Sequence, residues 1–184
     1  MKKYIFPSLK LTAVLIILCG VLYPLLISAV ARFAPGAGKG ETISVNGKVV
    51  GYANVGQKFT DDKYFQGRPS AVDYNAAGSA GSNKGPSNPE YLKLVQDRID
   101  SFLVHNPAIG RNEIPAEMVT ASGSGLDPDI SPASAFIQIN RIAKARSINE
   151  SVLKALVEKH TESAMLGPSK INVLKLNVAL DALK

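Results

Sequence analysis

The longest apolar stretch of the chain covers residues 11–31 and contains no charged residue. At about 1.5 Å per residue, a helix of this length spans roughly 30 Å, the thickness of the hydrocarbon core of a bilayer. The pattern therefore predicts a single transmembrane helix. Gly20 and Pro24 lie inside it, and membrane helices tolerate such residues where a neighbouring helix packs closely. We predict that both residues contact a partner helix.

After residue 31 the apolar positions fall into short groups separated by turn residues. Pro35 and several glycines predict a flexible tether over residues 32–40. Residues 42–45 and 48–55 are β-branched runs on either side of Asn46-Gly47, a pattern typical of a two-residue hairpin. The sequence thus predicts that folded structure resumes at about residue 41.

Helical periodicity dominates the second half of the chain. A helix is predicted from Asn88 or Ser87 to residue 105, a second after Ser131, and a third that opens with a Ser147-to-Glu150 capping box. A strand over residues 171–174 and a closing helix over 176–183 complete an α+β domain, residues 41–184, with a small sheet or hairpin and about four helices. The residues expected to face its core are Leu92, Val95, Ile99, Phe102, Leu103, Ala135, Phe136, Ile139, Ile142, Ala143, Val152, Leu153, Leu156 and Val157.

Charge sets the expected orientation. Lys2, Lys3 and Lys10 precede the apolar stretch, and the side richer in basic residues normally stays in the cytoplasm. We expect residues 1–10 inside and residues 41–184 outside. A cleaved signal sequence is the alternative, because residues 29–31 (AVA) fit a signal peptidase site. Of the net charge of +6, four positive charges come from the basic residues beside the apolar helix: Lys2, Lys3, Lys10 and Arg32. The exported part is therefore nearly neutral, and no nucleic-acid partner is predicted.

A long segment, residues 56–89, is rich in Gly, Ser, Asn and Pro and lacks regular periodicity. Half of the twelve Phe and Tyr residues lie in or beside it. Aromatic residues are rare in disordered segments and frequent at interfaces, so the segment either docks on a partner or is pinned to its own core. Both interpretations stay open. The aromatic residues concerned are Tyr52, Phe59, Tyr64, Phe65, Tyr74 and Tyr91.

The search for catalytic chemistry gives little. No phosphate-binding, nucleophile-elbow or zinc-protease motif is present, and His105 and His160 are isolated. A hydrolase built on Ser122 or Ser124 has no further support, and the loop aspartates lack the spacing of a calcium site. The small-residue turn over residues 120–127 could form an anion-binding nest. We predict no catalytic residue and no metal site.

Five ordered motifs carry a resemblance to a known family. They are residues 56–59 (GQKF), 64–71 (YFQGRPSA), 81–89 (GSNKGPSNP), 119–132 (VTASGSGLDPDISP) and 172–181 (NVLKLNVALD). On these motifs the chain resembles the C subunits (KdpC) of the Kdp potassium-transporting P-type ATPases. Ala80 and Asp129 depart from the family pattern, which usually has Gly and His at these positions.

The resemblance implies a non-catalytic accessory subunit of a high-affinity potassium uptake complex in the bacterial inner membrane. It would stabilise the assembly of the ion-conducting subunit KdpA and the ATP-hydrolysing subunit KdpB, with the small subunit KdpF as a further candidate partner, and would assist potassium access. The alternative is a catalytic chaperone that raises the ATP affinity of KdpB through a transient ternary complex. A generic membrane-tethered binding module, which would purify as a monomer, is the second alternative.

Two sets of site residues follow from this comparison. For the chaperone role the nucleotide would contact Ser122, Gly123, Ser124 and Gly125, with ATP supplied through the partner subunit and no cofactor bound stably. The expected orientation places that turn outside, away from cytoplasmic ATP. The remaining surface contacts are membrane lipid around the helix and partner subunits. The candidate partner-binding residues are Gly20, Pro24, Phe59, Tyr64, Phe65, Arg68, Tyr74, Asn83 and Asn88.

Overall fold

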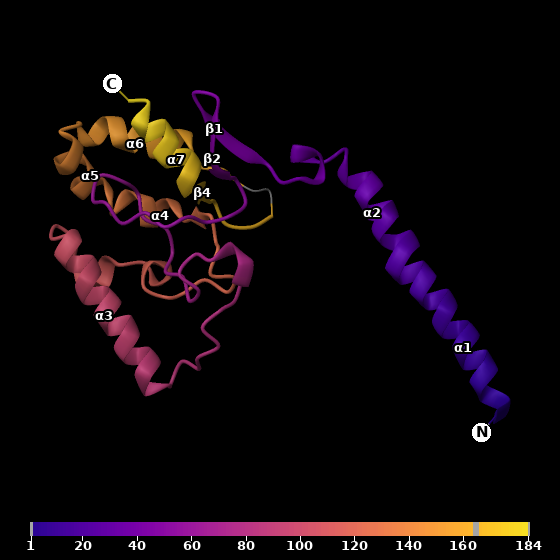
Figure 1. Ribbon diagram of the computed structural model, residues 1–184. Coiled ribbons are helices and arrows are strands. Elements are labelled where there is room, and N and C mark those ends of the chain that lie inside the picture. The colour runs from indigo at the N-terminus through magenta and orange to yellow at the C-terminus, as the bar shows by residue number, and fades with distance from the viewer. Residues whose placement is uncertain (1, 164–165, 184) are drawn as a thin grey trace. The chain divides into compact units, whose positions relative to one another are not determined.

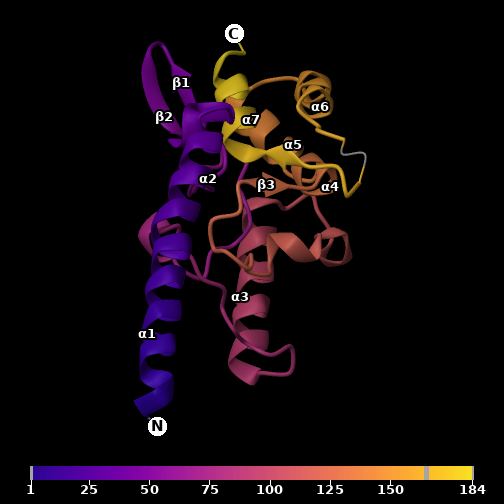
Figure 2. The same ribbon diagram turned by 90° about the vertical axis from the view of Figure 1, so that its right-hand side faces the viewer.

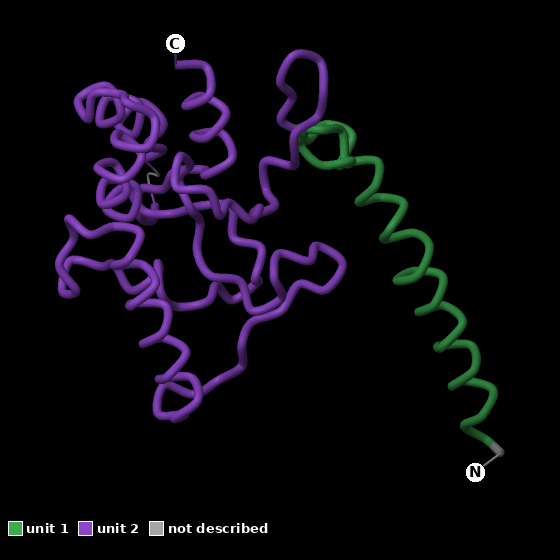
Figure 3. The backbone as a smooth tube through the Cα atoms, turned by 60° about the vertical axis from the view of Figure 1, so that its left-hand side comes forward, with its two compact units in different colours: residues 1–42 green, residues 43–184 purple. Residues whose placement is uncertain are grey.

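The computed structural model describes residues 2–163 and 166–183 and divides into two units, residues 1–42 and 43–184 (Figure 3). The first unit contains the apolar helix and the tether. The second is an α+β domain, as predicted. Each unit is described by itself.

The first unit is one long helical rod made of α1 (Lys2–Ile17), a π-helical turn (Leu18–Leu22) and α2 (Tyr23–Ala31) (Figure 1). Over Lys3–Ala31 the rod is long and apolar enough to cross a membrane; its most apolar stretch of 18 residues has a mean hydropathy of 2.6 and no part buried in the protein. Residues 2–10, predicted as a separate basic segment, continue the same helix.

The π-helical turn has a local cause. Pro24 has no backbone N–H, so it cannot complete the hydrogen bond to the carbonyl of Gly20. The N–H of Tyr23 instead reaches back to the carbonyl of Leu18, which widens the helix by one residue at this point. Gly20, predicted to admit a neighbouring helix, has no atom within 4 Å of the position that a Cβ would take.

The tether is more ordered than its glycines predict. A 3-10 turn, η2 (Pro35–Gly38), follows the helix and is closed by hydrogen bonds from Ala37 to Ala34 and from Lys39 to Gly36, each 2.9 Å long. Gly36 and Gly38 have positive φ angles of 75° and 78°, which allow the chain to turn back on the helix end. The glycines thus serve a tight turn rather than an open linker.

The predicted hairpin is confirmed. Strands β1 (Thr42–Val45) and β2 (Lys48–Tyr52) form a two-stranded sheet around Asn46 and Gly47. The φ angles of the two turn residues are 50° and 77°, as a type I′ turn requires. The second strand stops at Tyr52, three residues earlier than predicted, because a turn that bonds the N–H of Val55 to the carbonyl of Tyr52 follows it.

The rest of the second unit is mainly helical (Figures 1 and 2). Its elements in chain order are η3 (Ala76–Gly78), α3 (Pro89–His105), η4 (Arg111–Glu113), η5 (Ala116–Met118), β3 (Asp129–Ile130), α4 (Pro132–Phe136), α5 (Ile139–Arg146), α6 (Glu150–Lys159), β4 (Ile171–Asn172) and α7 (Val173–Asp181). Strands β3 and β4 pair antiparallel, with Ile130 opposite Ile171. Helix α6 packs against α4, α5 and α7.

Three boundaries differ from the prediction. The second predicted helix is broken after Phe136 into α4 and α5. Ser147, predicted to open the capping box, has a φ of 55° and ends α5, whereas Asn149 caps α6 by accepting a hydrogen bond from the N–H of Ser151. The last strand is short because the side chain of Asn172 caps α7, which begins at Val173.

The hydrophobic core lies between the central helices and the last helix. It joins residues from all parts of the domain, including Phe65, Phe102, Met118, Ile130, Ile139, Ile142, Leu153, Val157, Ile171, Leu176 and Leu180. Three positions predicted to be internal are exposed: Leu92 by 53%, Val152 by 43% and Phe136 by 38%. For Leu92 the reason is that the first half of α3 extends past the residues that cover Phe102.

Candidate docking site formed by the aromatic loop

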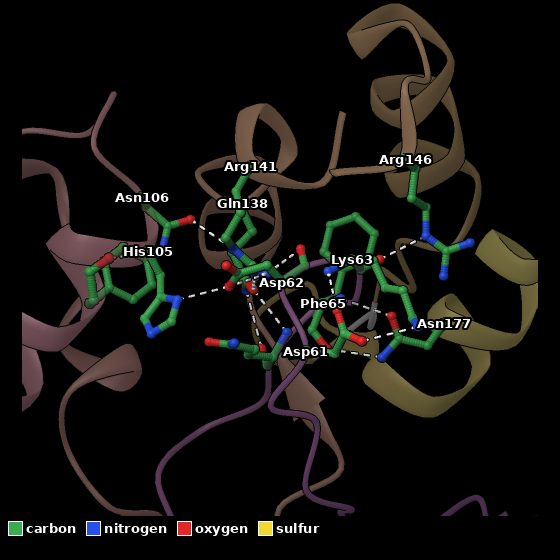
Figure 4. A network of polar contacts seen from close by, with 12 residues as sticks. Asp61, Asp62, Lys63, Phe65, His105, Asn106, Gln138, Arg141, Arg146 and Asn177 are labelled. Carbon is green, nitrogen blue, oxygen red and sulfur yellow. Dashed lines mark hydrogen bonds and ion pairs between the residues drawn. The ribbon is translucent and has the colours of Figure 1, made fainter. Parts of the chain in front are cut away.

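Two buried amide side chains fix the aromatic loop to the helices (Figure 4). Asn177 of α7 accepts a hydrogen bond from the N–H of Phe65 and donates one to its carbonyl, both 2.9 Å long. Gln138, which precedes α5, does the same for Gln66, at 2.8 and 3.1 Å. A primary amide has the same donor and acceptor groups as a peptide unit, so each side chain forms the pair of hydrogen bonds that a neighbouring strand would otherwise form. The backbone N–H and carbonyl groups of Phe65 and Gln66 thus have hydrogen-bond partners inside the domain.

A buried arginine fastens the preceding residues. Arg141 of α5 donates to the carbonyl of Asp62 at 2.5 Å, to Asn106 at 3.1 Å and to Gln138 at 2.8 Å. Burial lowers the pKa of Arg141, and the nearby Asp62 carboxylate partly offsets this effect. His105 lies 2.9 Å from the same carboxylate. The acidic residue therefore anchors the loop to two helices (Figure 4).

The predicted aromatic contacts divide into internal and surface residues. Phe65 has no exposed surface, so its predicted contact with a partner is wrong and its side chain belongs to the core. Tyr64 is only partly buried; its hydroxyl donates to Asp181 at 3.0 Å and its ring lies 4.8 Å from the Arg146 guanidinium carbon. Phe59 packs beside it, with ring centroids 5.7 Å apart. Partner contacts of Tyr64 and Phe59 stay predictions.

The second half of the loop lies against the small-residue turn. Arg68 donates to the Asp127 carboxylate at 3.0 Å, and the Tyr74 hydroxyl donates to the Arg68 carbonyl. The Ser70 hydroxyl donates to the carbonyl of Gly125 at 2.7 Å. Burial, followed by the charge of Asp127, raises the pKa of Tyr74 to about 12. Two motifs that are about fifty residues apart in the sequence thus meet in one structural unit.

The turn predicted to contact a nucleotide, residues 122–125, forms hydrogen bonds with the second half of the loop. Ser122 is only 3% exposed and its N–H donates to the carbonyl of Pro69 at 3.1 Å. The Ser124 hydroxyl accepts from the N–H of Leu126 at 3.0 Å, and its carbonyl accepts from the Ser79 hydroxyl. Gly123 is exposed. The hydrogen bonds to Pro69 and Ser79 join the turn to other parts of the domain, so the turn supports the fold from inside.

The remaining predicted partner-binding residues lie in other parts of the structure. Asn88 caps α3 by accepting a hydrogen bond from the N–H of Tyr91 at 3.0 Å, so a local structural role accounts for it. Asn83 is exposed and has a positive φ of 51°. Gly20 and Pro24 lie on the helix of the first unit.

Sequence reasoning missed an exposed apolar surface on the first half of α3. Leu92 is 53% exposed and Leu94 is 43% exposed. Leu94 falls outside the predicted apolar stripe, so the sequence does give a signal that this side chain is not part of the core-facing side of the helix. We call the exposed leucines Leu92 and Leu94 the α3 surface; because they are two residues apart, they project from different sides of the helix.

One more carboxylate supports the domain from inside. Glu117 accepts hydrogen bonds from the N–H of Ser131, at 2.8 Å, and from the hydroxyl of Ser134, at the beginning of α4. Burial raises the pKa of Glu117, but these hydrogen bonds more than offset it, so the pKa is lowered. The carboxylate thus stays ionised at a helix N-terminus, where negative charge is favoured.

Comparison with known proteins identifies the family of this small α+β domain and its apolar helix. The family model described as "KdpC: K+-transporting ATPase, c chain" matches residues 5–182. The chain is 62% identical to the Potassium-transporting ATPase KdpC subunit of Flavobacterium johnsoniae over 99% of this chain and all of that protein. It is 52% identical to the subunit of the same name from Bacteroides fragilis, over 99% of this chain and 98% of that protein. The chain belongs to the KdpC family.

Proposed function

We propose that this chain is an accessory subunit of a potassium-transporting ATPase in the bacterial inner membrane. Its helix spans the membrane with the N-terminus inside, and the α+β domain lies outside, where it holds the potassium-conducting and ATP-hydrolysing subunits together. The full-length family match supports membership of such a complex. The larger number of basic residues before the apolar stretch supports the orientation.

The observation that carries the docking role is the α3 surface. Leu92 and Leu94 are both large apolar side chains left exposed on this helix, and exposed apolar side chains of this kind are often covered at a protein interface. Elsewhere in the domain, Asn177 and Gln138 hold the aromatic loop in one conformation, and a domain ordered in this way loses less conformational entropy on docking.

The ATP-sharing role receives less support. It needs the hydroxyl and amide groups of the turn over residues 122–125 to face a nucleotide. Ser122 is buried, and its amide is bonded to Pro69. On the proposed side of the membrane, cytoplasmic ATP would not reach this turn.

Co-purification of the complex tests the docking role. Leu92→Glu with Leu94→Glu should lower the amount of partner subunits recovered with the tagged chain, because charged residues would replace buried apolar contacts worth about 1–2 kcal/mol or more each. Val104→Glu is a matched control, since Val104 is 77% exposed on the other end of the same helix. Equal recovery with the double variant and the control would remove the α3 surface from the proposal.

A further inference from the structure

A groove in the first unit lies where the apolar helix ends and the tether turns back. It has a volume of about 620 Å³. Its apolar wall is formed by Tyr23, Pro24 and Ile27, and its outer end by Arg32 and Lys39. Figure 3 shows the tether turn that closes this end of the helix. The groove thus has an apolar part along the helix and two basic side chains at one end.

The helix register places this groove at the membrane boundary. Residues 23–31 cover about 12 Å of helix, which is close to the depth of one leaflet's hydrocarbon layer, about 15 Å. Phe33, just beyond the helix, is 92% exposed, and aromatic and basic residues are typical of the interface between hydrocarbon and water. The apolar wall would therefore lie beside acyl chains and the cations beside headgroups.

The charges decide between two occupants. A partner helix could approach this face, because Gly20 lies on the same side of the rod. A neighbouring helix would cover the apolar wall but leave Arg32 and Lys39 without a counterion from within the groove, whose lining residues include no acidic side chain. An anionic headgroup supplies that negative charge and its acyl chain fills the apolar part.

We infer that this groove binds one anionic phospholipid. The phosphate lies between Arg32 and Lys39, and an acyl chain follows Tyr23 and Ile27 along the helix. The inference rests on the proposed membrane-spanning role of the helix. The bound lipid would fix the turn of the tether and thereby the point at which the exported domain leaves the membrane.

Native mass spectrometry of the full-length chain, together with any subunits that co-purify, tests this inference. Phosphatidylglycerol should be retained and phosphatidylcholine should not. Arg32→Gln with Lys39→Gln should weaken retention about fivefold for each cation, because a basic residue near an anionic lipid surface contributes about 1 kcal/mol. Lys10→Gln with Lys48→Gln removes two positive charges elsewhere and should leave retention unchanged.

A second variant tests the apolar part of the groove. Ser28 lines it, so Ser28→Leu should fill the groove and lower lipid retention while both cations remain. Thr12→Leu, toward the other end of the rod, is the matched control and should have no effect. Glycerophosphate without acyl chains should not displace the lipid, because it lacks the part that fills the groove.

The outcomes separate the two proposals. A chain released from membranes by alkaline carbonate would refute the membrane-spanning role itself. An integral chain that retains both lipids equally, or whose Arg32 and Lys39 variants retain phosphatidylglycerol normally, would refute the lipid site alone. Retention by the chain alone but not by the assembled complex would also refute it, because a partner subunit would then occupy the groove.

Discussion

Asn177→Ala should release the aromatic loop from the helices. The Asn177 side chain is almost fully buried and makes two hydrogen bonds of 2.9 Å to the backbone of Phe65. Alanine would leave one N–H and one carbonyl without partners in the interior. Each unsatisfied buried group costs about 1–3 kcal/mol, so we expect the free energy of unfolding to fall by about 2–5 kcal/mol.

Two measurements on the full-length chain in mild detergent would check this value. Urea unfolding followed by far-UV circular dichroism gives the change in stability, and hydrogen exchange of residues 61–70 reports the loop locally. Asn75→Ala is the control, since the exposed Asn75 side chain accepts one hydrogen bond, from the N–H of Ala77, and water can replace it. Its cost should stay within about 0.5 kcal/mol. Equal effects of the two variants would refute the anchoring role of Asn177.

Two other predictions concern the loop and the turn beneath it. The raised pKa of Tyr74, about 12 against an ordinary value of 10.0, means that its contribution is complete below pH 10.0 and is lost as the pH rises toward 12. Tyr74→Phe should therefore lose less stability than the parent chain between pH 10.0 and about pH 12 in urea unfolding, and identical losses would contradict the assignment. Ser122→Ala with Ser124→Ala should leave the ATP concentration for half-maximal hydrolysis by the complex unchanged, and an increase would favour the nucleotide-sharing role.

Local signals in the sequence predicted the elements well. Asn46-Gly47 identified the hairpin because its backbone preference matches one turn type, and Asn88 and Ser131 identified two helix starts because their side chains cap free N–H groups. The uncharged apolar run identified the helix of the first unit. These features depend on residues that are adjacent in the chain.

The placement of the loop could not be predicted in the same way. Phe65 is internal and Tyr52 is 47% exposed, although both are aromatic residues near the same loop. The difference comes from Asn177, more than a hundred residues away, whose amide fixes the backbone of Phe65. Ser147 was mistaken for a helix cap because a left-handed residue at a helix end and a capping residue have similar local sequences.

The exposure of Leu92 on α3 was also beyond local reasoning. Periodicity showed that Leu92 belongs to an amphipathic helix, but not how far the core extends along it. Phe102 is covered, and Leu92, ten residues earlier, is not. An apolar stripe longer than its own core is therefore visible only in the folded domain.

The location of the folded domain outside the cytoplasmic membrane is the central claim, and cysteine labelling tests it most directly. In a Cys19→Ser background, Val104→Cys places a thiol at a position whose valine is 77% exposed, and Ser8→Cys places one near the N-terminus. With a membrane-impermeant thiol reagent that crosses the outer envelope, the account predicts labelling of Val104→Cys in intact cells and of Ser8→Cys only after the cytoplasmic membrane is opened. The reverse pattern would contradict it and would place the domain within reach of cytoplasmic ATP.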